Sequence, residues 1–348
     1  MPLNDIFKLG VDKGASDVHL VVGLPPLIRV NGVLCPLEDL GELSRKKTEE
    51  LILSLLNPKQ KEQYLNDREL DISYELNTGE RFRVNLHFEK GNPSLVARII
   101  NLKPPTMEST DMPEIVYRLA DLHQGLIILT GPTGCGKSTS LAAIIDYINK
   151  KRAANIITLE DPIEFIFKPN KSIIRQRQYN FDFISFPEAL KHVLRQDPNV
   201  IMVGEMRDLE TISSTVTLAE TGHLVLTTLH TPNASQTVDR IIDIFPPHQQ
   251  DQIRMQLSMC LVGVIAQQLL PAPDGQERVV AREIMINTPA VANLIRENKI
   301  AQIKTVIQTS SDDGMISMDQ YLKYLVKNKK ITKEVASQYV IDGSGFDE

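Results

Sequence analysis

The amino-acid sequence predicts an α/β fold built on a parallel β-sheet, and it predicts that this sheet is only part of the protein. The length of 348 residues exceeds the size at which one hydrophobic core usually stops growing, so two domains are expected. After the first third of the chain, apolar runs alternate with helical segments, which is typical of a parallel sheet covered by helices. A glycine-rich loop joins one such apolar run to a helix.

The composition is that of an ordinary globular protein, and it limits the kinds of partner. Hydrophobic residues make up 42% of the chain and charged residues 24%, which argues against disorder. The formal net charge is −6, and no block of Lys and Arg dominates any segment. Because phosphate neutralisation supplies most of the affinity for nucleic acids, no nucleic-acid partner is expected.

The cysteines and the apolar segments predict a soluble, cytoplasmic protein. Cys35, Cys135 and Cys260 stand far apart without a C-x-x-C pair, which disfavours disulfides or a zinc knuckle and fits a reducing compartment. The first residues lack the basic and apolar regions of a secretory signal. The longest apolar stretch, residues 257–270, is interrupted by polar residues and is too short to span a bilayer.

The N-terminal part, residues 1–101, mixes short strands and helices. Strands are predicted at residues 17–22, 27–30 and 81–88. Asn31 and Gly32 stand between two apolar runs and are a strong signal for a hairpin turn. Residues 44–56 have apolar positions at helical spacing, with Ser44 as the predicted N-cap.

The prolines after Lys103 stop regular structure and mark an interdomain linker at residues 102–112. The α/β domain is predicted at residues 113–288, and a helical region at residues 289–348. Buried parallel strands are expected where the apolar runs are nearly continuous, at residues 126–129, 156–159, 200–203 and 224–226. The clearest C-terminal helices are predicted at residues 290–297 and 318–326.

The loop at residues 131–139 satisfies the pattern G-x-x-x-x-G-K-[ST] between a predicted strand and a helix expected at residues 141–148. Its glycines allow backbone amides to converge on phosphates, and the helix N-terminus adds a partial positive charge. Lys137 is predicted to bridge the phosphates and the Ser138 hydroxyl to bind Mg²⁺. The candidate nucleotide-binding residues are Gly131, Pro132, Thr133, Gly134, Cys135, Gly136, Lys137, Ser138 and Thr139.

Acidic residues follow two of the predicted strands. One apolar run ends in Glu205, and Gly204 before it is expected to leave room beside a nucleotide. Glu160 and Glu164 follow another run. Because ligands of open α/β sheets bind at the carboxyl ends of the strands, these acids are expected to converge on the phosphates, the metal and the attacking water. The alternative is that they are ordinary acids that cap helices.

Two histidines bracket the predicted strand at residues 224–226. His230 lies at its carboxyl end, on the predicted phosphate edge, so we favour a role for it as a sensor of the γ-phosphate. For His223, at the other end, a structural role and an interface role are equally open.

Cys135 lies inside the glycine-rich loop, next to a helix N-terminus and near Lys137. Such surroundings favour the thiolate form of a cysteine. The sequence therefore predicts that alkylating agents react with Cys135 and inactivate the protein, and that bound ATP protects it.

With these elements in this order, the chain resembles the secretion ATPases and, most closely, the type IV pilus retraction ATPases, over nearly its whole length. Residues 15–20, ASDVHL, are similar to the N-terminal signature of that family. GPTGCGKST resembles its Walker A motif, TLEDPIE its Asp box, VGEMRD its Walker B motif and TGHLVLTTLHT its His box. The tetracysteine zinc segment usual in assembly and secretion members is missing from the sequence, which favours the retraction branch.

The resemblance implies a homo-hexamer of RecA-like P-loop ATPase domains, each preceded by a PAS-like α+β domain and followed by a small helical region. It implies ATP and Mg²⁺ as cofactors, with the nucleotide between the two domains of a subunit. Arg81, Arg83 and Arg98 fall where the family places arginines that reach the γ-phosphate, and such an arginine is worth about 10³–10⁵ in rate. The alternative is that some of them only pair with surface carboxylates.

By the same analogy, Glu205 is assigned to the Mg²⁺ and water shell and Glu160 to polarising the attacking water, with Glu164 in reserve. The sequence does not separate these roles.

The implied partners are the inner-membrane platform protein of the pilus machine and a paralogous ATPase, at the pilus base on the cytoplasmic side of the inner membrane. The family motif AIRNLIRE corresponds to residues 290–297, where Ala292 replaces an arginine. An accessory, PilU-like retraction ATPase is therefore an alternative. A RecA-like nucleic-acid translocase and a nucleotide-gated scaffold with little turnover are more remote ones.

Overall fold

The computed structural model describes residues 1–100, 103–274 and 277–340. The chain divides into two compact units, Met1–Lys103 with Glu164–Ile166, and Pro104–Ile163 with Phe167–Glu348. Each unit is built around its own hydrophobic cluster. Among the described residues, no helix has both the length and the apolar character required to cross a membrane.

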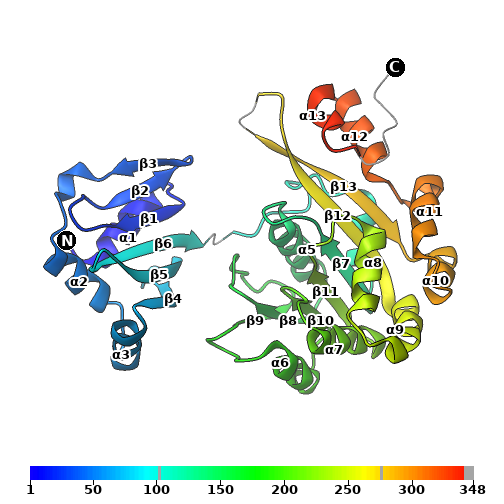
Figure 1. The fold of residues 1–348 in the computed structure, drawn as a ribbon, viewed down its shortest axis with the longest axis horizontal. Helices are drawn as coiled ribbons and strands as arrows, with labels where there is room; N and C mark the ends of the chain where they lie inside the picture. The colour runs from blue at the N-terminus through cyan, green and yellow to red at the C-terminus, as the bar shows by residue number, and fades with distance from the viewer. Residues whose placement is uncertain (101–102, 275–276, 341–348) are drawn as a thin grey trace. The chain divides into compact units, whose positions relative to one another are not determined.

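The first unit is an antiparallel sheet with helices packed on it, which makes it an α+β unit (Figure 1). The strand order is β3-β2-β1-β6-β5-β4. Its strands are β1 (Asp17–Leu20), β2 (Leu27–Val30), β3 (Val33–Pro36), β4 (Glu69–Glu75), β5 (Arg81–Glu89) and β6 (Asn92–Ile100). Its helices are α1 (Leu3–Asp12), α2 (Arg45–Leu53) and α3 (Pro58–Asp67), with a 3₁₀ turn η1 (Glu38–Leu40).

Local sequence signals in this unit are confirmed. Asn31 and Gly32 form the two-residue connection between β2 and β3, both with positive φ. The hydroxyl of Ser44 accepts a hydrogen bond from the backbone N–H of Lys47 and so caps α2. Along β5 the alternate residues Phe82, Val84 and Leu86 are buried, which agrees with the alternation in the sequence.

The second unit contains a seven-stranded sheet in the order β13-β12-β7-β11-β10-β8-β9. Its strands are β7 (Gly125–Thr130), β8 (Asn155–Glu160), β9 (Ile173–Gln178), β10 (Val200–Val203), β11 (Leu224–Thr228), β12 (Leu261–Pro271) and β13 (Arg278–Ile286). All neighbouring strands are parallel except β13, which pairs with β12 in the antiparallel sense. The prediction of an α/β fold with a parallel sheet is therefore confirmed.

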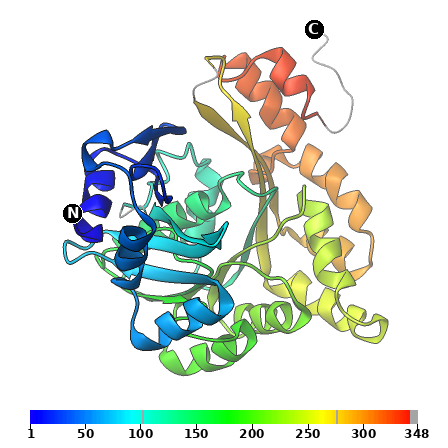
Figure 2. The same ribbon diagram turned by 60° about the vertical axis from the view of Figure 1, so that its left-hand side comes forward.

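Helices cover this sheet, and the last helices of the chain, drawn in orange and red, lie beyond its β12–β13 end (Figure 2). They are α4 (Glu114–Ala120), α5 (Lys137–Lys151), α6 (Phe186–Val193), α7 (Leu209–Glu220), α8 (Ala234–Asp243), α9 (Pro247–Cys260), α10 (Pro289–Arg296), α11 (Ile303–Thr309), α12 (Met318–Lys327) and α13 (Lys333–Ser337). Short 3₁₀ turns are η2 (Leu194–Gln196), η3 (Ile300–Gln302) and η4 (Ser311–Asp313). Helices α10 and α12 confirm the two C-terminal helices predicted from the sequence.

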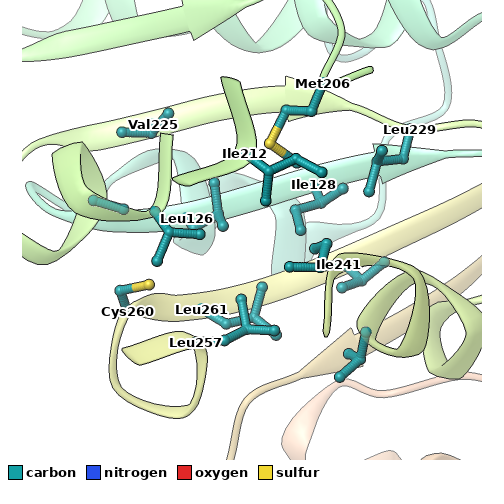
Figure 3. Packing of buried hydrophobic residues seen from close by; sticks show 14 of the residues in the cluster. Leu126, Ile128, Met206, Ile212, Val225, Leu229, Ile241, Leu257, Cys260 and Leu261 are labelled. Carbon is teal, nitrogen blue, oxygen red and sulfur yellow. The ribbon is translucent and has the colours of Figure 1, made fainter. Parts of the chain in front are cut away.

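The main core lies between the sheet and helices α7, α8 and α9. Figure 3 shows Leu126 and Ile128 of β7 together with Ile212 of α7 and Leu257 of α9 in one buried cluster. These side chains are excluded from water, and each contributes about 1.5–3 kcal/mol by burial. The core thus fixes β7, the strand that leads into the glycine-rich loop.

The long hairpin of β12 and β13 has no counterpart among the predicted strands. Residues 257–270 form one apolar stretch in the sequence, but the structure divides it between the end of α9 and β12. β12 lies between β7 and β13 and is buried over most of its length, so its residues do not alternate between polar and apolar. A continuous apolar run of this kind cannot be assigned to a strand or a helix by its periodicity.

Candidate nucleotide-binding site

The glycine-rich loop connects the end of β7, at Thr130, to the start of α5, at Lys137. The strand–loop–helix arrangement predicted from the sequence is present, and α5 begins four residues earlier than expected. Gly131 has a φ of 139°, and a Cβ atom on it would lie 2.2 Å from the carbonyl oxygen of Gln267, so no other residue fits there. No side chain caps the N-terminus of α5 in the described chain, and its first backbone amides are oriented for an anion.

Lys137 is folded back over the loop that precedes it. Its Nζ donates hydrogen bonds to the carbonyl oxygens of Gly131, at 2.7 Å, and Pro132, at 3.1 Å. The residue is only 8% exposed, which is unusual for a lysine. The ammonium group is therefore held inside the loop, where it can meet a phosphate.

His230 connects the loop to the strand end that carries Glu205. Its Nδ1 lies 3.4 Å from Nζ of Lys137, and its Nε2 lies 3.3 Å from Oε1 of Glu205. A lysine ammonium can only donate hydrogen bonds, so Nδ1 of the ring is the acceptor and Nε2 carries the proton. The neutral Nε2–H form of His230 satisfies both contacts at once.

Glu205 follows β10 and is partly buried, with its side chain 25% exposed. Its Oε2 accepts hydrogen bonds from the guanidinium of Arg207 at 2.9 Å, while Oε1 faces His230. The guanidinium of Arg207 and the imidazole of His230 thus orient the carboxylate of Glu205. Arg207 is not among the site residues predicted from the sequence.

Glu160 is the last residue of β8 and is 6% exposed. Its Oε1 accepts hydrogen bonds from the hydroxyl of Thr158, at 2.6 Å, and from the side-chain amide of Gln176, at 3.1 Å. Because β8, β10, β11 and β7 are parallel neighbours, the structure brings Glu160, Glu205 and His230 to the same edge of the sheet as the loop. Glu164 is exposed and belongs to the short segment that groups with the first unit.

The three arginines predicted to act on the γ-phosphate lie on β5 and β6 of the first unit. Nε of Arg81 is 2.8 Å from a carboxylate oxygen of Glu75, and Nε of Arg98 is 2.9 Å from one of Asp17. Arg83 is exposed and stands directly opposite Arg98 across the two strands. Arg98 keeps 73% of its side chain exposed in spite of its ion pair.

His223 has a structural contact at the opposite end of β11. Its Nδ1 lies 3.0 Å from the carbonyl oxygen of Leu218, in the last turn of α7. A histidine that contacts a carbonyl at a helix C-terminus stabilises the end of that helix. Because β11 separates the two histidines, His223 is not at the phosphate edge.

Two expectations for single residues are wrong. Gly204 does not leave space for a nucleotide, since a Cβ on it would lie 3.1 Å from the carbonyl oxygen of Leu159 at the end of β8. Cys135 is not biased toward the thiolate: it is 1% exposed, and burial raises the pKa of its thiol although Lys137 acts in the opposite direction. The burial of the side chain outweighs the positive charge nearby.

Two further polar residues, Thr130 and Gln267, hold the loop and are not among the predicted site residues. The Thr130 hydroxyl accepts a hydrogen bond from the backbone N–H of Thr231 at 2.9 Å and so ties the end of β7 to the segment after His230. Gln267 of β12, which is fully buried, contacts the loop through its side-chain amide. Neither residue belongs to a sequence pattern. Thr130 directly precedes the loop but meets Thr231 only in the fold, and the strand order places Gln267 at the loop.

Comparison with known proteins finds relatives that all belong to one family. Residues 92–339 match the family model for "Type II/IV secretion system protein". The type IV pilus retraction ATPase PilT of Pseudomonas aeruginosa is 44% identical over 97% of this chain and 98% of its own length. The chain belongs to the secretion ATPase family, in its pilus retraction branch. The type IV pilus ATPase PilU of the same organism, a further relative, is 41% identical over 97% of this chain and 88% of its own length.

The fold of this chain also agrees with that of a solved relative. A crystal structure of the pilus retraction motor PilT with bound ADP has a TM-score of 0.92 at 42% identity, covering 99% of this chain and 98% of that one. The chain is thus a nucleotide-dependent ATPase of this family, with the α/β fold that the sequence predicts.

Proposed function

We propose that this protein is a Mg²⁺-dependent ATPase that works as a homo-hexameric motor in type IV pilus retraction. The observation that carries the proposal is the contact of His230 with both Lys137 and Glu205. These contacts bring the phosphate loop, the Glu205 carboxylate and the His230 imidazole together at one edge of the sheet. Such a set of groups can bind a nucleotide and respond to its γ-phosphate.

The roles in the reaction follow from the donors and acceptors at this edge. Lys137 and the backbone amides of residues 131–139 bind the phosphates. Glu160, buried and held by Thr158 and Gln176, orients and polarises the attacking water. His230 donates from Nε2 and senses whether the γ-phosphate is present. Glu164 remains the reserve candidate for the base.

The oxygen donors at the site suit Mg²⁺ rather than a softer metal. The Ser138 hydroxyl and the Glu205 carboxylate are the proposed protein ligands, and Mg²⁺ usually takes few such ligands and completes its shell with phosphates and water. The described residues hold no cluster of three or more His, Cys, Asp or Glu that could form a closed metal cage. When bound, Mg²⁺ neutralises charge on the phosphates.

Arg81 and Arg98 are the proposed arginines for the γ-phosphate, with Arg83 beside them. The exposed guanidinium of Arg98 supports this role, because its ion pair with Asp17 leaves most of the side chain open to a partner. The proposed partners are five further copies of this chain, the inner-membrane platform protein of the pilus machine and a paralogous ATPase. The proposed location is the cytoplasmic side of the inner membrane at the pilus base.

An accessory motor of the same branch is the second candidate. Ala292, which replaces an arginine of the family motif, is 8% exposed in α10. The resemblance ties this motif to retraction rather than to ATP binding, so we expect the change to affect mechanical output rather than the nucleotide site. The 41% identity to PilU is compatible with this alternative.

Deletion of the gene with complementation in the host tests the proposal. Loss of twitching motility with pili still displayed on the surface supports retraction by this protein, whereas loss of surface pili contradicts it. A deletion strain that keeps twitching but pulls weakly indicates the accessory role. Strong stimulation of the purified ATPase by single-stranded DNA would point to a translocase instead.

A further inference from the structure

Gln267 lies on β12, next to the glycine-rich loop and to the first turn of α5. Its Nε2 donates a hydrogen bond to the carbonyl oxygen of Cys135 at 2.8 Å. Its Oε1 accepts one from the hydroxyl of Ser140, in the first turn of α5, at 3.0 Å. Its own carbonyl oxygen closes the space beside Gly131, where a Cβ would approach within 2.2 Å.

We infer that Gln267 is a positioning residue for the phosphate loop, which sets the direction of a backbone amide in it. In a trans peptide, the C=O and the N–H point in opposite directions. By holding the Cys135 carbonyl toward β12, Gln267 turns the N–H of Gly136 away from β12 and toward the open side of the loop. This inference rests on the proposed function only in that phosphates are the anions expected there.

The chemistry of the contact requires an amide of this length. The Cys135 carbonyl accepts a hydrogen bond, and the Ser140 hydroxyl donates one. The side chain at position 267 must therefore donate to the first and accept from the second. A primary amide does both, whereas a carboxylate only accepts. Gln267 is fully buried, and its partners cannot turn to water if the contact is lost.

β12 is itself held in place, so the amide is presented from a rigid element. Gln267 stands directly opposite Arg282 of β13, whose buried guanidinium donates to the carbonyl oxygens of Thr110, at 2.7 Å, and Asp111, at 2.9 Å. The strand is also paired with β7 on its other side. A site supported by strands in this way is positioned more accurately than one supported by loops.

The test uses Gln267→Met, which keeps the volume and removes both hydrogen bonds, and Gln267→Glu, which cannot donate to Cys135. Ser140→Ala removes one bond and leaves the Cys135 contact. Gln268→Met is the matched control, because Gln268 is the next residue of β12 and its side chain is on the other face of the strand. All variants are compared as full-length protein, with circular dichroism and thermal melting to verify the fold.

Two readouts are needed. The first is ADP affinity by calorimetry together with kcat and KM for ATP. We expect both Gln267 variants to weaken ADP binding about tenfold and to lower kcat about 10–100-fold, because small misplacements of a positioned group have effects of this size. Ser140→Ala should be intermediate, and Gln268→Met should match the wild type.

The second readout is the rate of maleimide labelling of Cys135 without nucleotide, followed by peptide mass mapping. In Gln267→Met the loop is released and the thiol should label about tenfold faster, the factor expected for loss of one hydrogen bond to the closed loop. Gln268→Met should label at the wild-type rate. This measurement reports the loop itself and does not depend on ATP hydrolysis.

Wild-type labelling rates and ADP affinities in Gln267→Met would overturn the inference. If Gln267→Met does not fold, an unchanged ADP affinity and labelling rate in Gln267→Glu, which has lost the donor to Cys135, would overturn it as well. Failure of the wild type to bind ADP would contradict the proposed function instead, and the labelling rates would still decide whether Gln267 positions the loop.

Discussion

His230 places its Nε2 3.3 Å from Oε1 of Glu205, although the two residues come from different strand ends. The other ring nitrogen faces Lys137 at 3.4 Å, so the imidazole lies between the carboxylate and the phosphate-binding ammonium. Because the ammonium can only donate, the tautomer with its proton on Nε2 is the one that satisfies both contacts. The His230 imidazole, with its donor at Nε2, is therefore suited to respond to the negative charge of a γ-phosphate nearby.

The first prediction compares the two histidines at the ends of β11. We expect His230→Ala to lower kcat about 10²-fold, as does the loss of one positioned donor in other active sites. ADP affinity should change little, because Lys137 and the loop amides remain. The measurement is steady-state ATP turnover beside ADP binding.

His223→Ala is the matched control for that prediction. Its ring contacts the carbonyl of Leu218 at the end of α7, so it should lower the melting temperature slightly and leave kcat unchanged. Equal kcat values in the two alanine variants would show that His230 has no special role.

The second prediction separates the two glutamates, which the sequence leaves equivalent. Glu205→Gln should raise the Mg²⁺ concentration needed for half-maximal turnover about tenfold, if the carboxylate helps to hold the metal and its water. Glu160→Gln should leave that concentration unchanged and lower kcat about 10²–10⁴-fold, because the buried carboxylate is the proposed group that polarises the water. Titration of turnover with Mg²⁺ distinguishes them, and a reversed pattern would exchange the two roles.

The third prediction concerns the reactivity of the cysteines. Burial raises the pKa of the Cys135 thiol, so its thiolate fraction at neutral pH is below that of a free cysteine and increases only as the pH rises through that higher pKa. Maleimide should therefore label Cys135 slowly at pH 7 and faster at alkaline pH. Cys35, which is partly exposed, should label first.

Cys135→Ser should keep the ATPase activity, because no step needs the thiolate. Rapid labelling of Cys135 at pH 7 in the native protein would contradict this prediction and restore the expectation drawn from the sequence.

The fourth prediction is a pH dependence of stability caused by Glu283 on β13. This carboxyl is 7% exposed, and burial raises its pKa even though its Oε1 accepts a hydrogen bond from the backbone N–H of Ala234 at 2.8 Å. The native state therefore binds the proton more tightly than the unfolded state. Its contribution to the free energy of unfolding is present below the ordinary pKa and is lost as the pH rises through the folded-state pKa.

Chemical denaturation at a series of pH values from acid to neutral measures this effect. Glu283→Gln does not titrate, so its free energy of unfolding should fall less than that of the wild type as the pH rises. Glu277→Gln, at an exposed position before β13, should behave as the wild type does. Parallel curves for all three proteins would exclude Glu283 as the cause.

Features that depend on neighbouring residues were predictable from the sequence. The glycine-rich loop, with Lys137 at the start of a helix, is a local pattern in which backbone conformation and chemistry coincide. The hairpin at Asn31 and Gly32 and the Ser44 cap are local in the same way. For such features a few consecutive residues contain all the atoms that take part.

The tertiary structure alone decided what meets at the site. The strand order places β11 beside β7 and β10 beside β11. His230 therefore reaches Lys137 across more than ninety intervening positions of the chain, and Glu205 reaches His230 from the next strand. The strand order also places Gln267 next to the loop and His223 at the far end of its strand. Pairing order is not encoded in any short pattern, because it results from the packing of the whole sheet.

Burial is the second property that only the fold determined. Cys135 has the sequence surroundings of a reactive thiol, yet burial raises the pKa of its thiol and removes it from solvent. The sequence by itself thus determined that this protein has a phosphate loop and an α/β ATPase fold. The folded sheet determined which distant side chains complete that loop, because contact and desolvation depend on position in space.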